Sequence, residues 1–119
     1  KNYDLDLLFA AFFSFKDIIE HKKYANNYDY HKSIFLMASH QLIENGFLLL
    51  KEDVSLNSPL AMLHYEYYED LSKVEKYIEE NEEKLQCVVS KYKIPFGQAQ
   101  NPHLWDYADG VDTIVFLTN

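Results

Sequence analysis

The N-terminal segment carries its apolar side chains at helical spacing. They cover much of the helix circumference over residues 4–20 instead of forming one narrow stripe. Asp4 or Asp6 can cap the start, because an aspartate side chain accepts hydrogen bonds from the free N–H groups of a first turn. The pattern predicts a helix over 4–20 that is buried on much of its surface. Its apolar positions are Leu5, Leu8, Phe9, Phe12, Phe13, Phe15, Ile18 and Ile19.

A polar and aromatic segment follows at residues 21–30. It is predicted to be a link, because the paired Asn26 and Asn27 favour turns. A second helix is predicted over 29–43. It is expected to stop at 45–46, an Asn-Gly pair, because glycine accepts the left-handed geometry of a helix C-cap.

The next segments alternate strands with a helix. Residues 47–50 are a short apolar run and 60–68 alternate between two faces, so both predict strands, with a loop over 51–59 between them. Residues 70–85 predict a helix and 86–90 a further strand. Strand, helix and strand in this order form a βαβ unit, whose strands should be parallel with a right-handed crossover.

The helix predicted at 70–85 has the most regular pattern in the chain. Ser72 and Glu75 have the spacing of a capping box. The acidic outer face favours a solvated surface over a functional site. The inner face is formed by Val74, Tyr77, Ile78 and Leu85, and the outer face by Glu75, Glu79, Glu80, Glu82 and Glu83.

The C-terminal residues 111–117 predict a last strand, entered through a turn at Asp109 and Gly110. The fold class is therefore α/β, with helices packed on a small mixed sheet that contains a βαβ unit. At 119 residues the chain is expected to form a single domain over 1–119.

Charge and composition exclude several classes of partner. The formal charge of −8 disfavours nucleic acid and anionic membranes. The longest apolar block, 7–13, is much shorter than the roughly 20 residues that span a bilayer. The single cysteine, Cys87, excludes an internal disulfide and a cysteine-based zinc site, and indicates a cytoplasmic protein.

Familiar catalytic motifs are missing from the sequence. The 3 glycines do not form a dinucleotide-binding or Walker loop, and the 5 histidines lack the spacing of a helical metal site. Cys87 lies in a predicted strand, next to the apolar Val88 and Val89, which indicates a buried structural cysteine.

The loop over residues 95–102 differs from the rest of the chain. Its ends are prolines, which limit its freedom, and between them lie the carboxamides of Gln98, Gln100 and Asn101. A rigid polar loop of this kind can orient a substrate group through hydrogen bonds. The pattern is equally compatible with a loop that only connects strands.

At this loop the sequence resembles a known family. Residues 94–100, Ile-Pro-Phe-Gly-Gln-Ala-Gln, followed by 106–113, Asp-Tyr-Ala-Asp-Gly-Val-Asp-Thr, resemble the C-terminal signature of LuxC-type acyl-CoA reductases, in particular the short versions of Bacteroidetes. The likeness continues upstream through 23–30, 45–52 and 58–60, and so covers nearly the whole chain.

The resemblance implies a fold and a set of site residues. The family belongs to the aldehyde dehydrogenase superfamily, and this chain is similar to the later part of its catalytic domain. Residues 58–60 stand where the superfamily has Gly-Pro-Val, and 95–97 resemble its Pro-Phe-Gly loop. The superfamily's cofactor-binding Glu corresponds to Ser55, so its usual ribose contact is not implied here. The residues implied to line the substrate and cofactor cleft are Asn57, Ser58, Pro59, Pro95, Phe96, Gly97, Gln98 and Gln100.

The implied reaction is the NADPH-dependent reduction of an acyl-CoA or other acyl thioester to a fatty aldehyde, through an acyl-cysteine intermediate. Cys87 does not match the sequence context of the family's nucleophile. The catalytic cysteine and most of the cofactor domain are therefore expected upstream, outside this chain. No residue of this chain is assigned a catalytic or metal-binding role, and the chain alone is expected to be inactive.

Two further points follow from the sequence. The chain begins at Lys1 instead of Met, and it is expected to be a trimmed piece of a longer reductase. The alternative is a stand-alone, non-catalytic module that binds a partner protein through its aromatic surface. Homo-oligomerisation is compatible with both hypotheses.

Overall fold

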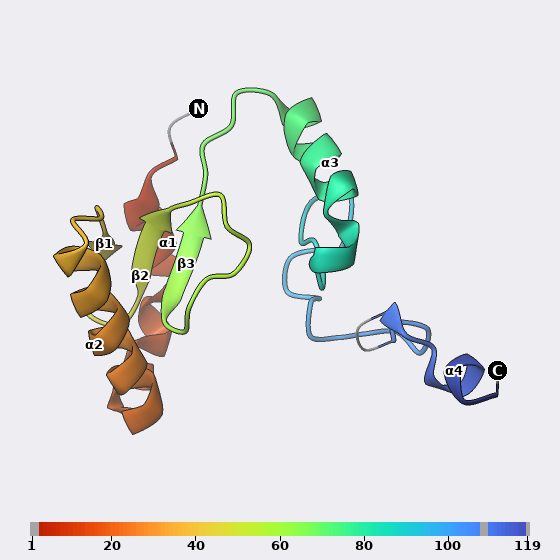
Figure 1. Ribbon diagram of the computed structural model, residues 1–119, viewed down its shortest axis with the longest axis horizontal. Helices are drawn as coiled ribbons and strands as arrows, with labels where there is room; N and C mark the ends of the chain where they lie inside the picture. The colour runs from red at the N-terminus through yellow and green to blue at the C-terminus, as the bar shows by residue number, and fades with distance from the viewer. Residues whose placement is uncertain (1–2, 108–109, 119) are drawn as a thin grey trace. The chain divides into compact units, whose positions relative to one another are not determined.

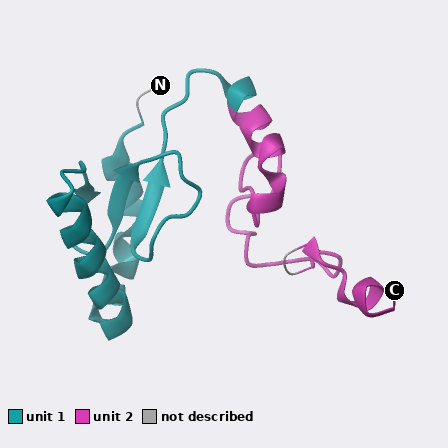
Figure 2. Ribbon diagram, in the orientation of Figure 1, with its two compact units in different colours: residues 1–73 teal, residues 74–119 magenta. Residues whose placement is uncertain are grey.

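The computed structural model describes residues 3–107 and 110–118 (Figure 1). The chain divides into two compact units, Lys1–Lys73 and Val74–Asn119, and each is described by itself (Figure 2). They are called unit 1 and unit 2. The prediction of one domain over 1–119 stays a prediction.

Unit 1 contains a mixed sheet of three strands in the order β1-β2-β3 (Figure 1). β1 (Ile43–Glu44) pairs antiparallel with β2 (Leu49–Glu52), and β2 pairs in parallel with β3 (Met62–Tyr65). The register sets Leu49 opposite Met62 and Lys51 opposite His64. A small mixed sheet with helices confirms the predicted α/β class.

Helices cover both faces of this sheet (Figure 1). On one face, α2 (Lys22–Met37) contributes Tyr28 to a core with Leu49, Ala61 and Met62. On the other face, α1 (Leu5–Phe12) packs against a core of Phe47, Leu48 and Leu50. Successive residues of a strand point to opposite faces, so β2 supplies one leucine to each core. Leu49 is 0% and Leu50 1% exposed.

The predicted N-terminal helix is present, although its geometry changes halfway. α1 is followed by the 3₁₀ helix η1 (Phe13–Glu20), and the Asp4 carboxylate accepts the Asp6 N–H at 3.0 Å, as predicted for a cap. The expectation that this helix is buried on much of its surface is wrong. Leu7, Phe13 and Phe15 are 60%, 60% and 65% exposed.

The predicted link at 21–30 is wrong, because these residues are helical from Lys22 onward. The Asn27 side chain donates to the Lys23 carbonyl at 2.8 Å, within the helix itself, and the next residue, Tyr28, is buried. Tertiary packing therefore outweighs the turn preference of asparagine.

The predicted stop of this helix at 45–46 is also wrong, because α2 ends at Met37. The His40 N–H donates to the Phe35 carbonyl at 2.9 Å, and Ser39 takes the left-handed conformation with φ 61°. Ser39 thus occupies the position directly after the C-cap residue Ala38, where glycine is usual.

The Asn-Gly pair makes the turn between β1 and β2. The Asn45 side-chain oxygen accepts the N–H groups of Phe47 and Leu48 at 3.2 and 2.9 Å, and Gly46 has φ 91°. A side chain that satisfies two turn amides favours a hairpin here over a helix end.

Residues 53–61 connect the parallel strands without a helix. β2 lies two residues further along the chain than the predicted strand 47–50, and β3 occupies the middle of the predicted strand 60–68. The connection ends at Ala61, which has φ 67° and whose carbonyl accepts the Leu49 N–H at 2.9 Å. A left-handed alanine turns the chain into the sheet.

α3 (Leu71–Glu80) begins in unit 1 and continues into unit 2, where the 3₁₀ helix η2 (Glu82–Lys84) follows. The predicted helix 70–85 is confirmed over Leu71–Glu80. Its cap is Asp70 and not Ser72, because the Asp70 carboxylate accepts the Ser72 N–H at 3.0 Å.

The predicted strand 86–90, and with it the βαβ unit, is wrong. Only an isolated bridge pairs Val89 with Ile94 in this segment. The Ile94 N–H donates to the Val88 carbonyl at 3.1 Å and the Ser90 N–H to the Ile94 carbonyl at 2.9 Å. These bonds close a tight loop, so the segment satisfies its polar groups locally.

The predicted strand 111–117 is wrong as well, because the chain forms α4 (Thr113–Thr118) there. The Asp112 carboxylate accepts the N–H groups of Ile114 and Val115 at 3.0 and 3.1 Å. This N-cap outweighs the strand preference of the β-branched residues that follow. In the predicted turn, Gly110 has φ 68°, and Asp109 lies outside the described residues. No described helix combines the length and apolar character that crossing a bilayer requires.

Candidate functional site

Three of the predicted cleft residues, Asn57, Ser58 and Pro59, lie in the connection between β2 and β3. Local bonds hold this connection: Ser55 Oγ accepts the Asn57 N–H at 3.3 Å, and the Pro59 carbonyl accepts the Met62 N–H at 3.1 Å. The side chains of Asn57 and Ser58 are exposed. They are thus available to a ligand on a backbone that the sheet anchors.

The other five, Pro95, Phe96, Gly97, Gln98 and Gln100, lie in the loop of unit 2 and are exposed. The loop consists of two successive turns. The Gln98 N–H donates to the Pro95 carbonyl at 3.1 Å, and the Asn101 N–H to the Gln98 carbonyl at 2.9 Å. Gly97, third in the first turn, has φ 80°, which a side chain would strain. The predicted rigidity of this loop therefore has a hydrogen-bonded basis.

The carboxamides of the loop differ in their freedom. The Asn101 amide donates to Gln98 Oε1 at 3.1 Å, so the oxygen of the exposed Gln98 side chain is engaged. The two groups of predicted cleft residues belong to different units (Figure 2). Their meeting in one cleft stays a prediction.

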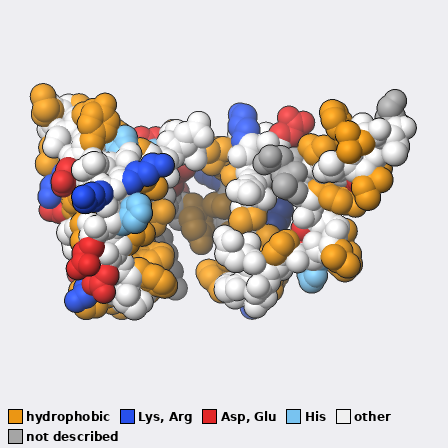
Figure 3. Space-filling view, turned by 90° about the horizontal axis from the view of Figure 1, so that it is seen from below, with side chains coloured by type: hydrophobic (Ala, Val, Ile, Leu, Met, Phe, Trp, Pro, Cys, Tyr) orange, Lys and Arg blue, Asp and Glu red, His pale blue; other side chains and the backbone are white. Residues whose placement is uncertain are grey.

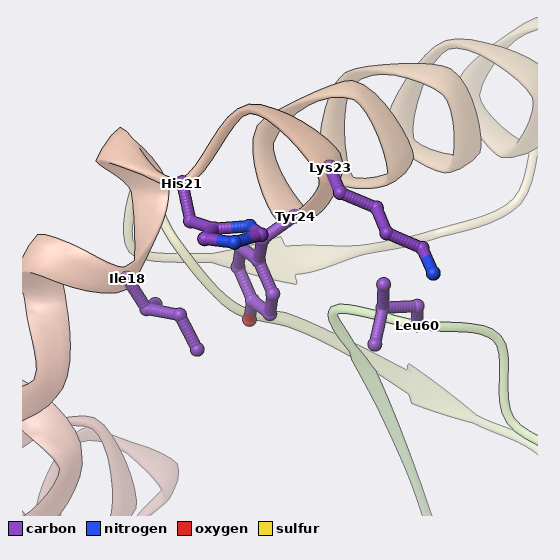
Figure 4. Close-up of a pocket in the computed structure, with 5 residues that line it drawn as sticks. All are labelled: Ile18, His21, Lys23, Tyr24 and Leu60. Atoms are coloured by element: carbon purple, nitrogen blue, oxygen red, sulfur yellow. The ribbon is translucent and has the colours of Figure 1, made fainter.

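A pocket of about 390 Å³ lies in unit 1, beside the first of these groups (Figure 4). Its lining comes from η1, from the first turn of α2 and from the residue that directly follows Pro59. In Figure 4 the Lys23 side chain extends toward Leu60. The lining residues are Ile18, His21, Lys23, Tyr24 and Leu60.

Tyr24 lines this pocket with a ring that a hydrogen bond holds in place. Its hydroxyl donates to the Phe47 carbonyl at 2.7 Å, which joins α2 to the hairpin, and burial raises the pKa of this phenol. Sequence reasoning did not find the pocket. The available signal was the basic run 21–23, which is unusual in a chain of net charge −8.

Charged side chains also gather at the carboxyl end of β2 and β3. Lys51 is 7% exposed, pairs with the Asp53 carboxylate and lies 5.2 Å from the centre of the Phe35 ring. His64 Nδ1 lies 2.8 Å from the Ser55 carbonyl, to which it must donate, because a carbonyl only accepts. The Lys51 ammonium, through its bond to Asp53, holds the pKa of that carboxyl at about 2.

This ion pair predicts a specific acid sensitivity. Since the folded state lowers the Asp53 pKa from 3.8 to about 2, the pair stabilises the fold fully above pH 3.8. The stabilisation is lost as pH falls toward about 2. Asp53→Asn should therefore flatten the loss of stability over this range, measured as urea midpoints at stepped pH. Asp17→Asn, at an exposed aspartate of η1, is the control, and an equal flattening there would contradict the assignment.

The other candidate groups do not form a reactive centre. Cys87 is exposed, so its prediction as a buried strand residue is wrong, because the strand that would bury it does not form. Within residues 3–107 and 110–118 no group of three or more His, Cys, Asp or Glu side chains could hold a metal ion.

Searches of protein-family models, of curated proteins and of solved structures found no match to this chain.

Proposed function

We propose that this chain is the C-terminal part of an NADPH-dependent acyl-CoA reductase of the LuxC type, which converts an acyl thioester to a fatty aldehyde. The observation that carries the proposal is the signature over 94–100 and 106–113. The double turn of the loop supports it, because a hydrogen-bonded loop can hold carboxamides in place for a substrate.

The chemistry divides between this chain and the rest of the reductase. A cysteine thiolate attacks the thioester carbonyl, and the coenzyme A thiolate leaves. NADPH, when bound, supplies the hydride that reduces the acyl carbon, and the aldehyde is released as the cysteine thiolate re-forms. Each glycine of this chain lies at a separate turn, so the chain offers no glycine-rich cradle for a pyrophosphate. The cofactor would therefore be held mainly by other parts of the protein.

The surface of unit 2 fits a part of a larger protein. None of residues 74–107 and 110–118 is buried. Phe96 is 80%, Leu104 96% and Trp105 69% exposed. Apolar side chains exposed to this degree mark a surface that other protein covers.

The competing function is a non-catalytic module that binds a partner through the same apolar surface. The two functions differ in what a longer polypeptide containing this chain does with acyl-CoA and NADPH. A reductase lowers the absorbance at 340 nm and forms an aldehyde that a hydrazine reagent traps. Binding of a partner protein without any loss of absorbance would favour the module.

Gln98 and Gln100 provide the residue-level prediction. In the longer enzyme, Gln98→Ala combined with Gln100→Ala should lower kcat/KM by about tenfold, which corresponds to the loss of roughly one net hydrogen bond. Gln86→Ala is the matched control, because this glutamine is exposed in unit 2 but lies outside the loop. Unchanged kinetics in the double variant would make the loop a connection only.

A further inference from the structure

The pocket of unit 1 combines an apolar wall with two basic side chains. Ile18 and Leu60 are 43% and 48% exposed, and both line it together with the Tyr24 ring (Figure 4). His21 and Lys23 complete the lining. We propose that this pocket binds a fatty carboxylate, with the chain on the apolar wall and the carboxylate at Lys23 and His21.

The apolar part of the argument is the position of the aliphatic side chains. Ile18 and Leu60 come from segments far apart in sequence and line the same hollow. Tyr24 cannot rotate away without losing its bond to the Phe47 carbonyl. An alkyl chain placed here removes apolar area of all three residues from water, which contributes about 25 cal/mol per Å² buried.

The electrostatic part is the concentration of positive charge in an acidic chain. Residues 21–23 read His-Lys-Lys in a protein of net charge −8. Among the described residues, neither His21 nor Lys23 makes an ion pair, in contrast to Lys32 and Lys51. Figure 3 shows lysine and histidine side chains near one another on one face of unit 1, with acidic side chains on the same face. This charge favours an anionic head group over a neutral or cationic one.

The N-terminus of α2 adds to the positive potential at the pocket. The first N–H groups of a helix have no intrahelical partner, and the His21 side chain makes no cap bond to them. The hollow is open to solvent, and its volume of about 390 Å³ accommodates one chain with a small head group.

This inference goes beyond the proposed reductase, because it concerns the free carboxylate and needs no turnover. The test is calorimetric titration of the 119-residue chain with sodium decanoate below its micelle concentration. Decyl maltoside has the same chain with a neutral head, and acetate has the head without the chain. Decanoate should bind at least tenfold more tightly than either.

Matched variants locate the site. Lys23→Glu should weaken decanoate binding by at least tenfold, whereas Lys22→Glu should change it less than threefold. Both changes alter charge equally on the first turn of α2, but Lys22 does not line the pocket. Leu60→Asn should likewise weaken binding, and Leu56→Asn, at a 40% exposed leucine of the same connection, should not.

Three results would each overturn the proposal. Equal binding of decyl maltoside and decanoate would mean that the head group is not recognised. Equal losses in the two lysine variants would mean diffuse attraction instead of a site. Undetectable binding of decanoate, with the circular dichroism spectrum of a folded chain, would mean that the pocket is not a fatty-carboxylate site.

Discussion

Leu49→Ala is expected to lower the free energy of unfolding of unit 1 by about 2–5 kcal/mol. Leu49 is 0% exposed on the central strand and packs with Tyr28, Ala61 and Met62. Removing its branched end leaves a hole that a strand paired on both sides cannot close. Urea unfolding followed by far-ultraviolet circular dichroism measures the change.

The matched control for Leu49→Ala is Leu63→Ala. Leu63 lies on β3, the outer strand next to β2, and is 39% exposed. Less apolar area is lost there and water fills the space, so the cost should be clearly smaller. Equal losses of unfolding free energy in the two variants would contradict the placement of Leu49 in the core of unit 1.

Tyr28→Ala is expected to cost about 3–5 kcal/mol, because a large buried ring is removed from the core between α2 and the sheet. Tyr28 is 4% exposed, and its hydroxyl donates to the Glu44 carboxylate, which joins α2 to β1. Burial and the bond to Glu44 raise the pKa of the phenol. The ring and the hydroxyl thus stabilise the unit in different ways.

Tyr28→Phe separates the two contributions. It keeps the ring and removes only the hydroxyl, so it should cost about 1–2 kcal/mol. Lys32→Met tests the other partner of Glu44, whose oxygen lies 2.7 Å from the ammonium. Because both side chains of that pair are about a third exposed, its loss should cost less than about 1 kcal/mol. A larger effect of Lys32→Met than of Tyr28→Phe would contradict this order.

The sequence allowed the fold class and the positions of the strongest elements to be predicted. The helical period over 4–20 located α1 and η1, and the alternation over 60–68 contains β3. These predictions held because each pattern reflects burial on one face of a regular element. The burial of the N-terminal helix was overestimated. Apolar content alone does not show which sides of a helix contact other elements.

The errors arose where one short polar contact selects the local structure. Asn45 bonds two amides of a turn, and Asp112 bonds two amides of a helix start. Composition favours a helix end at the first place and a strand at the second. Side-chain caps of this kind differ by small free energies, and propensity does not rank them reliably.

The candidate site was predictable only in part. The first turn, 95–98, is favoured by Gly97, which accepts a positive φ at the third position, whereas the second turn, 98–101, contains neither proline nor glycine. The pocket is different, because Leu60 lies near η1 and α2 only through the tertiary arrangement of unit 1. A periodic pattern does not predict such a tertiary contact. The only sequence signal for the pocket was the basic run 21–23.

The left-handed conformation of Ala61 has a consequence in stereochemistry. A residue with φ 67° is mirror-related to the ordinary helical region, so L-alanine is strained there and a D-residue would not be. The strain, about 1–2 kcal/mol, is retained because the methyl group packs in the core and the carbonyl bonds Leu49. The chain therefore changes handedness for one residue, directly after Leu60. Leu60, which lines the pocket, is therefore positioned by Ala61, an L-residue in a conformation that D-residues prefer.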